Sequence, residues 1–425
     1  MLQIGIAPEH SQIKAKSTLL LTNFGRKTNI EASRSKKGSA MRPPNGTSDC
    51  QSKPPATHPT RTSNSVEIDR RSFHRLAAAG LGALAVPAFP SMATPPWPKD
   101  RKDSKTEKSP AELVAPARKS IDKGLDFLLR SQVKSGRNRG AFSNSGISSG
   151  VATASLGGLA MMCGGHMPGL GKFGKSIDMC VEYVLKNVRE TGYIATRDGG
   201  ARENMYGHGF SMLFLSQAYG MTRKREIGEK LRKAVELTCN SQNNQGGWRY
   251  QPTKSDADLS ITVCQIMGLR GARDAGIDVP DEVRKKCIEY VQKSQNPNGS
   301  FRYTMQGGHT TFAMTAAGVT SLYSAGIYEG EQVEKAIAYL MKFKPNGAQQ
   351  GGGHYFYSNY YAVQAMWHAG GKPWDEWYPL IRNQLVKNQS AEGSWRSSEA
   401  GPEFGAAMGC IILQMPLNYV PVFSP

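Results

Sequence analysis

One pattern recurs six times between Ile121 and Pro416: a basic amphipathic stretch, a Gln-Asn-Gly turn that closes on an aromatic residue, and a stretch rich in small and apolar residues. The closing aromatics lie 40 to 55 residues apart in the sequence. Periods near this size are typical of stacked supersecondary units, so the repeat constrains the fold more than any other feature. The six aromatics are Phe142, Tyr193, Trp248, Phe301, Tyr355 and Trp395.

The two stretches of each repeat predict two kinds of helix. In the third repeat Leu231 and Val235 share one side of a helix while charged residues such as Arg232 point away, which predicts an outer, amphipathic helix. The second stretches are nearly free of charge, and a helix that is apolar all round must be buried. They cover residues 261–269, 312–323 and 404–415, among others. Six pairs of one outer and one inner helix would close a double ring, so we predict an all-α fold.

The N-terminal quarter has a different character. Arg70, Arg71 and Phe73 precede an Ala/Gly-rich apolar run at 76–89 and the small residues that flank Met92. This order is typical of a twin-arginine export signal, and the 14-residue run is shorter than the roughly 20 residues of a membrane-spanning helix. We therefore expect export to the periplasm or cell envelope, with a mature chain that begins at Thr94.

The domain organisation follows from these boundaries. Residues 1–68 are polar and irregular, and we interpret them as a disordered or misassigned N-terminal extension. Residues 69–93 are the predicted signal peptide, residues 94–117 a linker rich in Pro and charge, and residues 118–425 the repeat domain. Of the formal net charge of +19, +11 belongs to the predicted mature chain, because residues 1–93 hold 13 Lys and Arg against 5 Asp and Glu; the basic residues of the mature chain concentrate on the predicted outer helices. A solvated exterior explains it, an anionic membrane surface is the alternative partner, and no motif suggests nucleic acid.

The segments SQNNQGGWRY at 241–250 and DLSITVCQIMGLRGAR at 258–273 resemble the prenyltransferase and squalene-cyclase repeat superfamily, as in squalene–hopene cyclases. The resemblance covers nearly all of the repeat region. It implies an α/α toroid whose inner helices surround a central cavity that binds an isoprenoid or another apolar ligand. Because function resides in a site placed on a fold, each candidate residue needs its own argument.

Two acidic residues carry the resemblance to terpene cyclases. Class II enzymes of that family use a DxDD run to protonate an alkene or epoxide, and the matching residues here include Asp256 and Asp258. Asp258 falls on the position of the family's proton donor, while Leu259 replaces the last Asp of the motif. The resemblance thus implies terpene-cyclase-type acid catalysis through Asp258, in a motif that is only partly retained.

Zinc-dependent protein prenyltransferases of the same superfamily hold their metal with an Asp, a Cys and a His. Asp258 matches the Asp, but Ser260 replaces the Cys and Tyr357 replaces the His. Two of the three ligands are therefore missing, which argues against this activity. We expect no metal and no cofactor.

Polar and aromatic residues recur at the starts of the predicted inner helices, and helix starts in a ring point toward one mouth. The expected catalytic residues are Asp258, Asp256, His309 and His208, and the expected substrate-binding residues are Tyr206, Tyr357, Tyr360 and Glu403; Ser148 and Ser149 belong to the same set. The alternatives are structural: Asp258 as a helix cap and the two histidines as satisfied core or rim residues. Arg249, Arg302 and Arg396, each next to a repeat aromatic, are predicted to tie neighbouring repeats, with anion binding as the alternative.

Three functions remain open. The leading hypothesis is an exported toroid that binds an isoprenoid or other apolar molecule, with acid chemistry at Asp258. A non-catalytic binding or scaffold protein of the envelope is the second. A carbohydrate-active α/α-toroid enzyme is the third, and its acid and base would have to come from residues such as Asp258 or Glu403.

Overall fold

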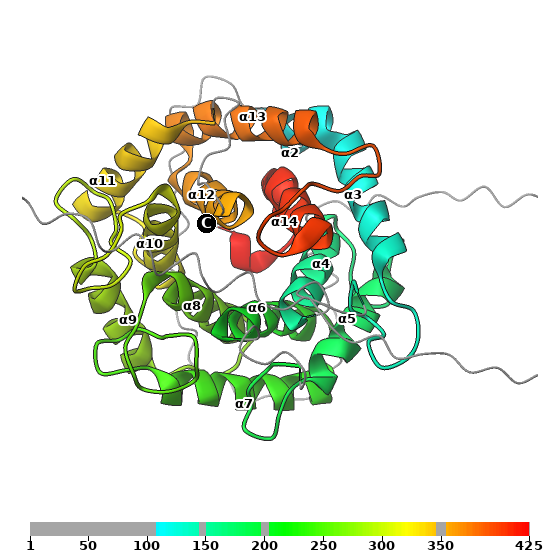
Figure 1. Cartoon of the computed structure of the whole chain (residues 1–425), viewed down its shortest axis with the longest axis horizontal. Coiled ribbons are helices and arrows are strands. Elements are labelled where there is room, and N and C mark those ends of the chain that lie inside the picture. Colours follow the sequence, from blue (N-terminus) through cyan, green and yellow to red (C-terminus); the bar gives the residue numbers. More distant parts are fainter. Residues whose placement is uncertain (1–107, 144–149, 197–203, 346–353, 425) are drawn as a thin grey trace, which may run out of the picture. The chain divides into compact units, whose positions relative to one another are not determined.

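The computed structural model describes residues 108–143, 150–196, 204–345 and 354–424. Within these ranges the protein is helical, with isolated backbone bridges and no strands. The longer helices alternate between two layers (Figure 1). One layer comprises α3 (Arg118–Ser131), α5 (Gly174–Lys186), α7 (Arg225–Ser241), α9 (Asp281–Lys293), α11 (Glu331–Leu340) and α13 (Gly371–Asn388). The other comprises α4 (Val151–Cys163), α6 (Met205–Thr222), α8 (Leu259–Asp274), α10 (Phe312–Ser324), α12 (Tyr355–Ala369) and α14 (Gly401–Gln414).

Burial distinguishes the two layers. All 13 residues of α10 are buried, whereas only seven of the 17 residues of α7 are. Consecutive inner helices pack on one another from α4 to α14, and α14 packs back on α4 (Figure 1). The predicted all-α class and the α/α toroid are therefore confirmed. Amphipathic stretches form the outer helices and uniformly apolar stretches the inner ones, because only the inner helices are buried on all sides.

The Gln and Gly of the repeat turn join each outer helix to the next one. The Gln242 amide donates to the carbonyl of Gly246 in its own turn and to the carbonyl of Val283 on α9, both at 2.9 Å. Gly246 has φ +98°, and a Cβ at this position would overlap the carbonyl oxygen of Lys286 on α9. Only glycine fits such a backbone conformation and such a close approach.

The last repeat turn makes the same contacts with the first outer helix. The Gln389 amide donates to the carbonyls of Gly393 and of Ser120 on α3, at 2.9 and 2.8 Å. A Cβ on Gly393 would overlap the carbonyl oxygen of Lys123, also on α3. One sequence motif therefore provides both the contacts between consecutive repeats and the contact between the last repeat and the first.

The aromatic that closes the turn packs between the layers. Trp248 and Trp395 are almost fully buried, and each indole N–H donates to a carbonyl of its own outer helix at 2.8 Å. Phe301 lies so close to Gly318 of α10 that a Cβ there would overlap the ring. Small residues in the inner stretches thus make room for the repeat aromatics.

The predicted linker boundary at residue 117 is wrong. Residues Pro110–Val114 form α2, and residues Ala115–Ala117 form a 3-10 turn, η1, that contacts α13. Ser109 and Glu112 make a reciprocal capping box at the start of α2, the arrangement that stabilises short helices. Val114 and Ala117 are fully buried, so this segment belongs to the helical domain and not to a linker.

The predicted N-terminal extension and the signal peptide at 69–93 lie outside the described residues. Among the helices that the structure does describe, none combines the length and the apolar character needed to cross a membrane. Export therefore stays a prediction from the sequence.

Candidate functional site

The starts of α6, α8 and α12 bring three of the predicted residues together. Tyr206 lies in the first turn of α6, Asp258 is the N-cap of α8, and Tyr357 lies in the first turn of α12. The Tyr206 hydroxyl is 2.5 Å from the Ser260 hydroxyl, and the Tyr357 hydroxyl donates to the Ser260 carbonyl at 2.9 Å. The Tyr206 and Tyr357 rings meet edge to face with centroids 6.0 Å apart. This group at the helix starts is the candidate site.

The two oxygens of the Asp258 carboxyl have different environments. Oδ1 accepts a hydrogen bond from the Ser260 hydroxyl at 2.5 Å and one from the Ile261 backbone N–H at 2.9 Å. Oδ2 makes no hydrogen bond of good geometry among the described residues, although an Arg249 guanidinium nitrogen lies 3.2 Å away. The side chain is fully buried. Oδ2 is thus the oxygen with capacity for a proton.

Burial is the main influence on the ionisation of Asp258. It raises the pKa of this carboxyl, because the charged form is poorly solvated. Hydrogen bonds from Ser260 and Ile261 and the positive charge of Arg249 act in the opposite direction and limit the rise. The protonated acid is therefore easier to form here than on an exposed aspartate, while a cation lies beside the carboxylate.

An aromatic enclosure surrounds the Arg249 side chain. Its guanidinium lies over the rings of Tyr250 and Tyr303, 4.9 and 5.6 Å from their centroids. The hydroxyls of these two tyrosines are 2.6 Å apart. Stacking of this kind attracts a cation to the ring faces, so Arg249 is held against Asp258 from two sides. The predicted role of Arg249 as a tie between repeats is compatible with these contacts, since Tyr303 belongs to the next repeat.

His208 lies away from this group. Its ring is fully buried between α6 and α7, where Nδ1 accepts from the Ile194 N–H at 3.2 Å and Nε2 lies 2.8 Å from the Thr238 hydroxyl. Burial lowers the pKa of His208 to about 4, so the ring is neutral at pH 7. Both nitrogens already have protein partners, which corresponds to the alternative of a satisfied core histidine.

Asp256 and His309 are exposed. The Asp256 carboxylate is 67% exposed and lies 3.4 Å from an Arg249 nitrogen, so it touches the edge of the site. His309 lies on the loop that precedes α10. The structure does not bring His309 to the Asp258 carboxyl.

Tyr360 is buried one helical turn deeper than Tyr357. Its ring meets Phe210 and Phe423 edge to face, with centroids 5.9 and 6.1 Å apart. Phe423 belongs to η7 (Pro421–Phe423), the C-terminal turn, which contacts α8 inside the ring of helices (Figure 1). Tyr360 therefore packs in the interior and does not line the mouth with Tyr206.

The same C-terminal segment occupies the ring interior near the far end of α8. An Arg270 guanidinium nitrogen donates to the Ser424 carbonyl at 3.0 Å. Arg270 follows Asp258 by 12 residues, which corresponds to about 18 Å along a helix. At this depth the C-terminal segment fills the interior, where the resemblance implied a central apolar cavity.

Glu403 lies in the first turn of α14 and is half-buried. A different acid, Glu399, reaches the start of α12: its two carboxylate oxygens accept from the Phe356 and Tyr357 N–H groups at 3.2 and 3.1 Å. Burial raises the pKa of Glu399. Glu399, which the sequence analysis did not single out, therefore contacts the backbone of a site residue.

Tyr250 and Tyr303 also escaped the sequence analysis, and Ser260 was considered there only as the replacement of a zinc ligand. Tyr250 and Tyr303 each lie two residues after a repeat aromatic, and each accepts a backbone hydrogen bond at the start of an inner helix, from Met205 at 3.0 Å and from Leu259 at 2.9 Å. The repeat register was the signal that could have found them. Ser148 and Ser149 lie outside the described residues.

The donor set does not resemble a metal centre. Within the described ranges no three His, Cys, Asp or Glu side chains are close enough to hold an ion. The neighbours of Asp258 are instead a serine, tyrosines and an arginine, which suit proton transfer and stabilisation of positive charge.

Comparison with known proteins identifies the fold and nothing finer. No protein-family model matches the sequence, and no curated protein does. Solved structures match over most of the chain. One is a cellobiose 2-epimerase from Bacillus thermoamylovorans, with a TM-score of 0.54, 12% identity, and coverage of 71% of this chain and 98% of that one.

Two further structures show the chemical breadth of this fold. A variant of the type II terpene cyclase MstE from Scytonema, in complex with its product merosterolic acid A, has a TM-score of 0.51 and 14% identity, with coverage of 73% and 99%. A variant of an alpha-1,6-mannanase from Salegentibacter has a TM-score of 0.50 and 10% identity, with coverage of 71% and 98%. At these identities the likeness concerns the toroid alone.

Proposed function

We propose that this α/α-toroid protein binds an apolar, unsaturated molecule of the isoprenoid class at the Asp258 end of the ring and protonates it through Asp258. The observation that supports this proposal is the asymmetry of the Asp258 carboxyl. One oxygen is saturated with hydrogen bonds, and the other has none and faces a guanidinium.

The proposed chemistry starts from the protonated acid. The proton sits on Oδ2, because Oδ1 already accepts from Ser260 and Ile261. Transfer of that proton to a carbon–carbon double bond leaves a carboxylate on the protein and a carbocation on the ligand. Arg249 stabilises the carboxylate, and the faces of nearby tyrosine rings stabilise the cation by roughly 0.5–2 kcal/mol each.

The cation on the ligand then loses a proton to water, and a short hydrogen-bonded chain returns a proton to the carboxylate at Oδ1, the oxygen that Ser260 contacts. The Ser260 hydroxyl hydrogen is used in the bond to Asp258, so the Tyr206 hydroxyl is the donor to Ser260. Burial raises the pKa of Tyr206, which keeps this phenol protonated. In this scheme Tyr206 and Ser260 connect the buried carboxyl to the half-buried edge of the site.

Two matched variants test the proposal. Asp258→Asn removes the acidic proton, and Asp256→Asn makes the same charge change at an exposed neighbour. The protein is purified from its own envelope, analysed by native mass spectrometry, and its bound lipids are extracted and identified. We expect an isoprenoid to co-purify with the protein. The natural protein and Asp256→Asn should convert it, whereas Asp258→Asn should bind it without converting it. The absence of any retained isoprenoid, or conversion by Asp258→Asn, would refute the proposal.

A non-catalytic binding protein is the second candidate. The observation that favours it is the position of Asp258 as the N-cap of α8, fully buried, which explains the residue without any chemistry. Under this proposal the lipid is retained unchanged by all three proteins. The twin-arginine signal supports the same envelope location for both candidates, and N-terminal sequencing of the exported protein checks the predicted start at Thr94.

A further inference from the structure

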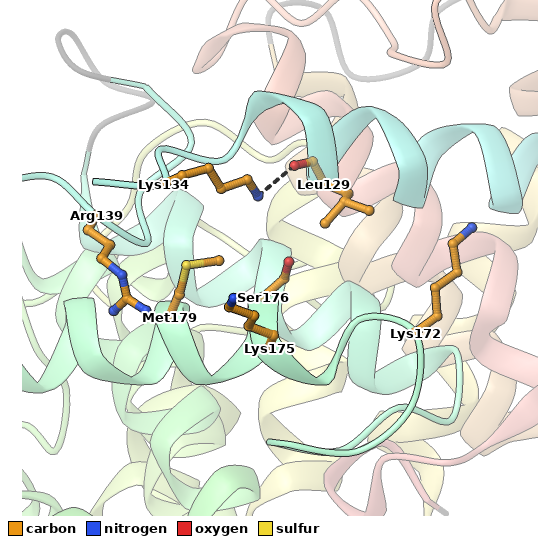
Figure 2. A pocket seen from close by; sticks show the side chains of 7 residues that line it. All are labelled: Leu129, Lys134, Arg139, Lys172, Lys175, Ser176 and Met179. Carbon is orange, nitrogen blue, oxygen red and sulfur yellow. Dashed lines mark hydrogen bonds between the residues drawn. The ribbon is translucent and has the colours of Figure 1, made fainter. Parts of the chain in front are cut away.

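A hollow lies between the outer helices α3 and α5 (Figure 2). Its volume is about 430 Å³, which is within the range of small-molecule sites. It is remote from α8 in the ring (Figure 1). Its lining combines four cationic side chains with two apolar ones and a hydroxyl: Lys134, Arg139, Lys172, Lys175, Leu129, Met179 and Ser176.

Two of the four cations have no acidic partner among the described residues. Arg139 pairs with Glu182, and Lys172 lies 2.6 Å from Asp126. Lys134 donates instead to neutral acceptors. One is the Leu129 carbonyl at 2.8 Å (Figure 2), and the other is the Gln132 side-chain oxygen at 3.2 Å. Lys175 is exposed and forms no ion pair within the described ranges. The hollow therefore carries an excess of about two positive charges.

The burial and the neighbouring positive charge affect the ionisation of Lys134. Burial lowers the pKa of Lys134, and repulsion from Lys175 lowers it further. Cations that lack a counter-charge in a hollow are stabilised by an anion that enters it. Ser176, which is only 2% exposed, adds a hydroxyl on the α5 side of the hollow.

We propose that the hollow between α3 and α5 binds a phosphate group that is attached to a small apolar moiety. A phosphate monoester carries about −1.5 to −2 charges at pH 7, which matches the excess at Lys134 and Lys175. Lysine acts on phosphate as a point charge, and the Ser176 hydroxyl supplies a directed hydrogen bond. Leu129 and Met179 form the apolar part of the lining, where the moiety attached to the phosphate makes contact.

Phenyl phosphate is a suitable probe because it combines both features. We compare its binding to the full chain with binding to a Lys134→Gln/Lys175→Gln variant by isothermal titration calorimetry. The control is Lys285→Gln/Lys293→Gln, which removes the same charge from α9. We expect the first variant to bind at least tenfold more weakly and the control to bind like the natural protein. Equal affinity in all three proteins, or no binding by the natural protein, would overturn the proposal.

The phosphate could come from a soluble metabolite or from a lipid headgroup. Co-sedimentation with vesicles that contain phosphatidic acid distinguishes the two, because a lipid source predicts vesicle binding that phenyl phosphate competes away and that Lys134→Gln/Lys175→Gln loses. A soluble source predicts phenyl phosphate binding without vesicle binding. Circular dichroism and the denaturation midpoint confirm that the variant is folded. Neither result depends on Asp258, so these experiments test the phosphate site independently of the proposed acid chemistry.

Discussion

The starts of α8 and α10 occupy equivalent positions in consecutive repeats, yet they are capped by different chemistry. Asp258 accepts from the N–H three residues later, and Thr311 does the same on α10. Four residues after each cap a threonine hydroxyl, Thr262 or Thr315, accepts from the N–H of the repeat aromatic at 3.2 Å. The backbone arrangement of the two helix starts is the same.

The comparison shows what the fold requires and what it does not. A hydroxyl is sufficient to cap α10, and Asn204 caps α6 with an amide oxygen. Asp258 adds a second carboxylate oxygen that capping does not use, and it is fully buried against Arg249. Thr311 is exposed. A surplus ionisable group in a buried place is costly for stability and is a frequent sign of a functional site.

The largest expected difference between the two caps is in stability. Asp258→Ala removes the cap and also leaves Arg249 with only the exposed Asp256 as an acidic partner, so we expect a loss of about 3 kcal/mol of unfolding free energy. Thr311→Ala removes only a cap and should cost about 1 kcal/mol. Urea denaturation of both variants measures the difference. Similar losses at the two positions would mean that Arg249 contributes nothing beyond packing.

A double-mutant cycle isolates the ion pair from the cap. We expect a coupling energy of about 1 kcal/mol between Arg249→Gln and Asp258→Asn, since their charged groups are in contact. Arg302 holds the position equivalent to Arg249 in the next repeat, but it donates to backbone carbonyls, including that of Ser294. The cycle of Arg302→Gln with Thr311→Ala should therefore give a coupling near zero.

The pH dependence of stability distinguishes a buried acid from a cap. Because folding raises the pKa of Asp258, its stabilising contribution is complete below the unfolded-state pKa of about 3.9 and is lost as the pH rises through the folded-state pKa. The unfolding free energy of the natural protein, relative to that of Asp258→Asn, should fall as the pH rises from 4 to 7. The matched difference between the natural protein and Thr311→Ser should not change with pH. A relative free energy that rises with pH would show that Arg249 outweighs burial.

The smallest effect is expected when the carboxylate is transferred to the other cap. Thr311→Asp places an acid at an exposed helix start with no buried arginine, so the unfolding free energy should change by less than about 0.5 kcal/mol. Thermal denaturation provides the measurement. A loss above 1 kcal/mol would mean that the two helix starts are less alike than their hydrogen bonds indicate.

Much of the fold could be predicted because it depends on local periodicity and on a repeated turn. The Gln and Gly of that turn recur in the sequence, and Gln242 and Gln389 make equivalent contacts in different repeats. The convergence of Tyr206, Asp258 and Tyr357 was also predictable, since inner helices of a ring start at one end. The capping box of Ser109 and Glu112 was a readable signal that the linker interpretation overlooked.

Other residues depended on the rotation of each helix about its axis. Successive residues of a helix point about 100° apart, so His208 faces α7 although Tyr206 faces the site. Tyr360, three residues after Tyr357, packs on Phe423 in the interior instead of lining the mouth. A periodic pattern indicates which residues are buried but not which neighbour each one meets.

The sequence by itself determined the toroid, because amphipathic and apolar helices alternate in a repeat, and a recurring turn joins each pair to the next. It also pointed to Asp258, through the partly retained acidic run that resembles the terpene-cyclase motif. Only the tertiary structure decided the partners of that acid, the contact of Glu399 with α12, and the position of the C-terminal segment inside the ring. The last two contacts join residues that are far apart in the chain. They lie in segments without sequence periodicity, and they form only when the helices have packed.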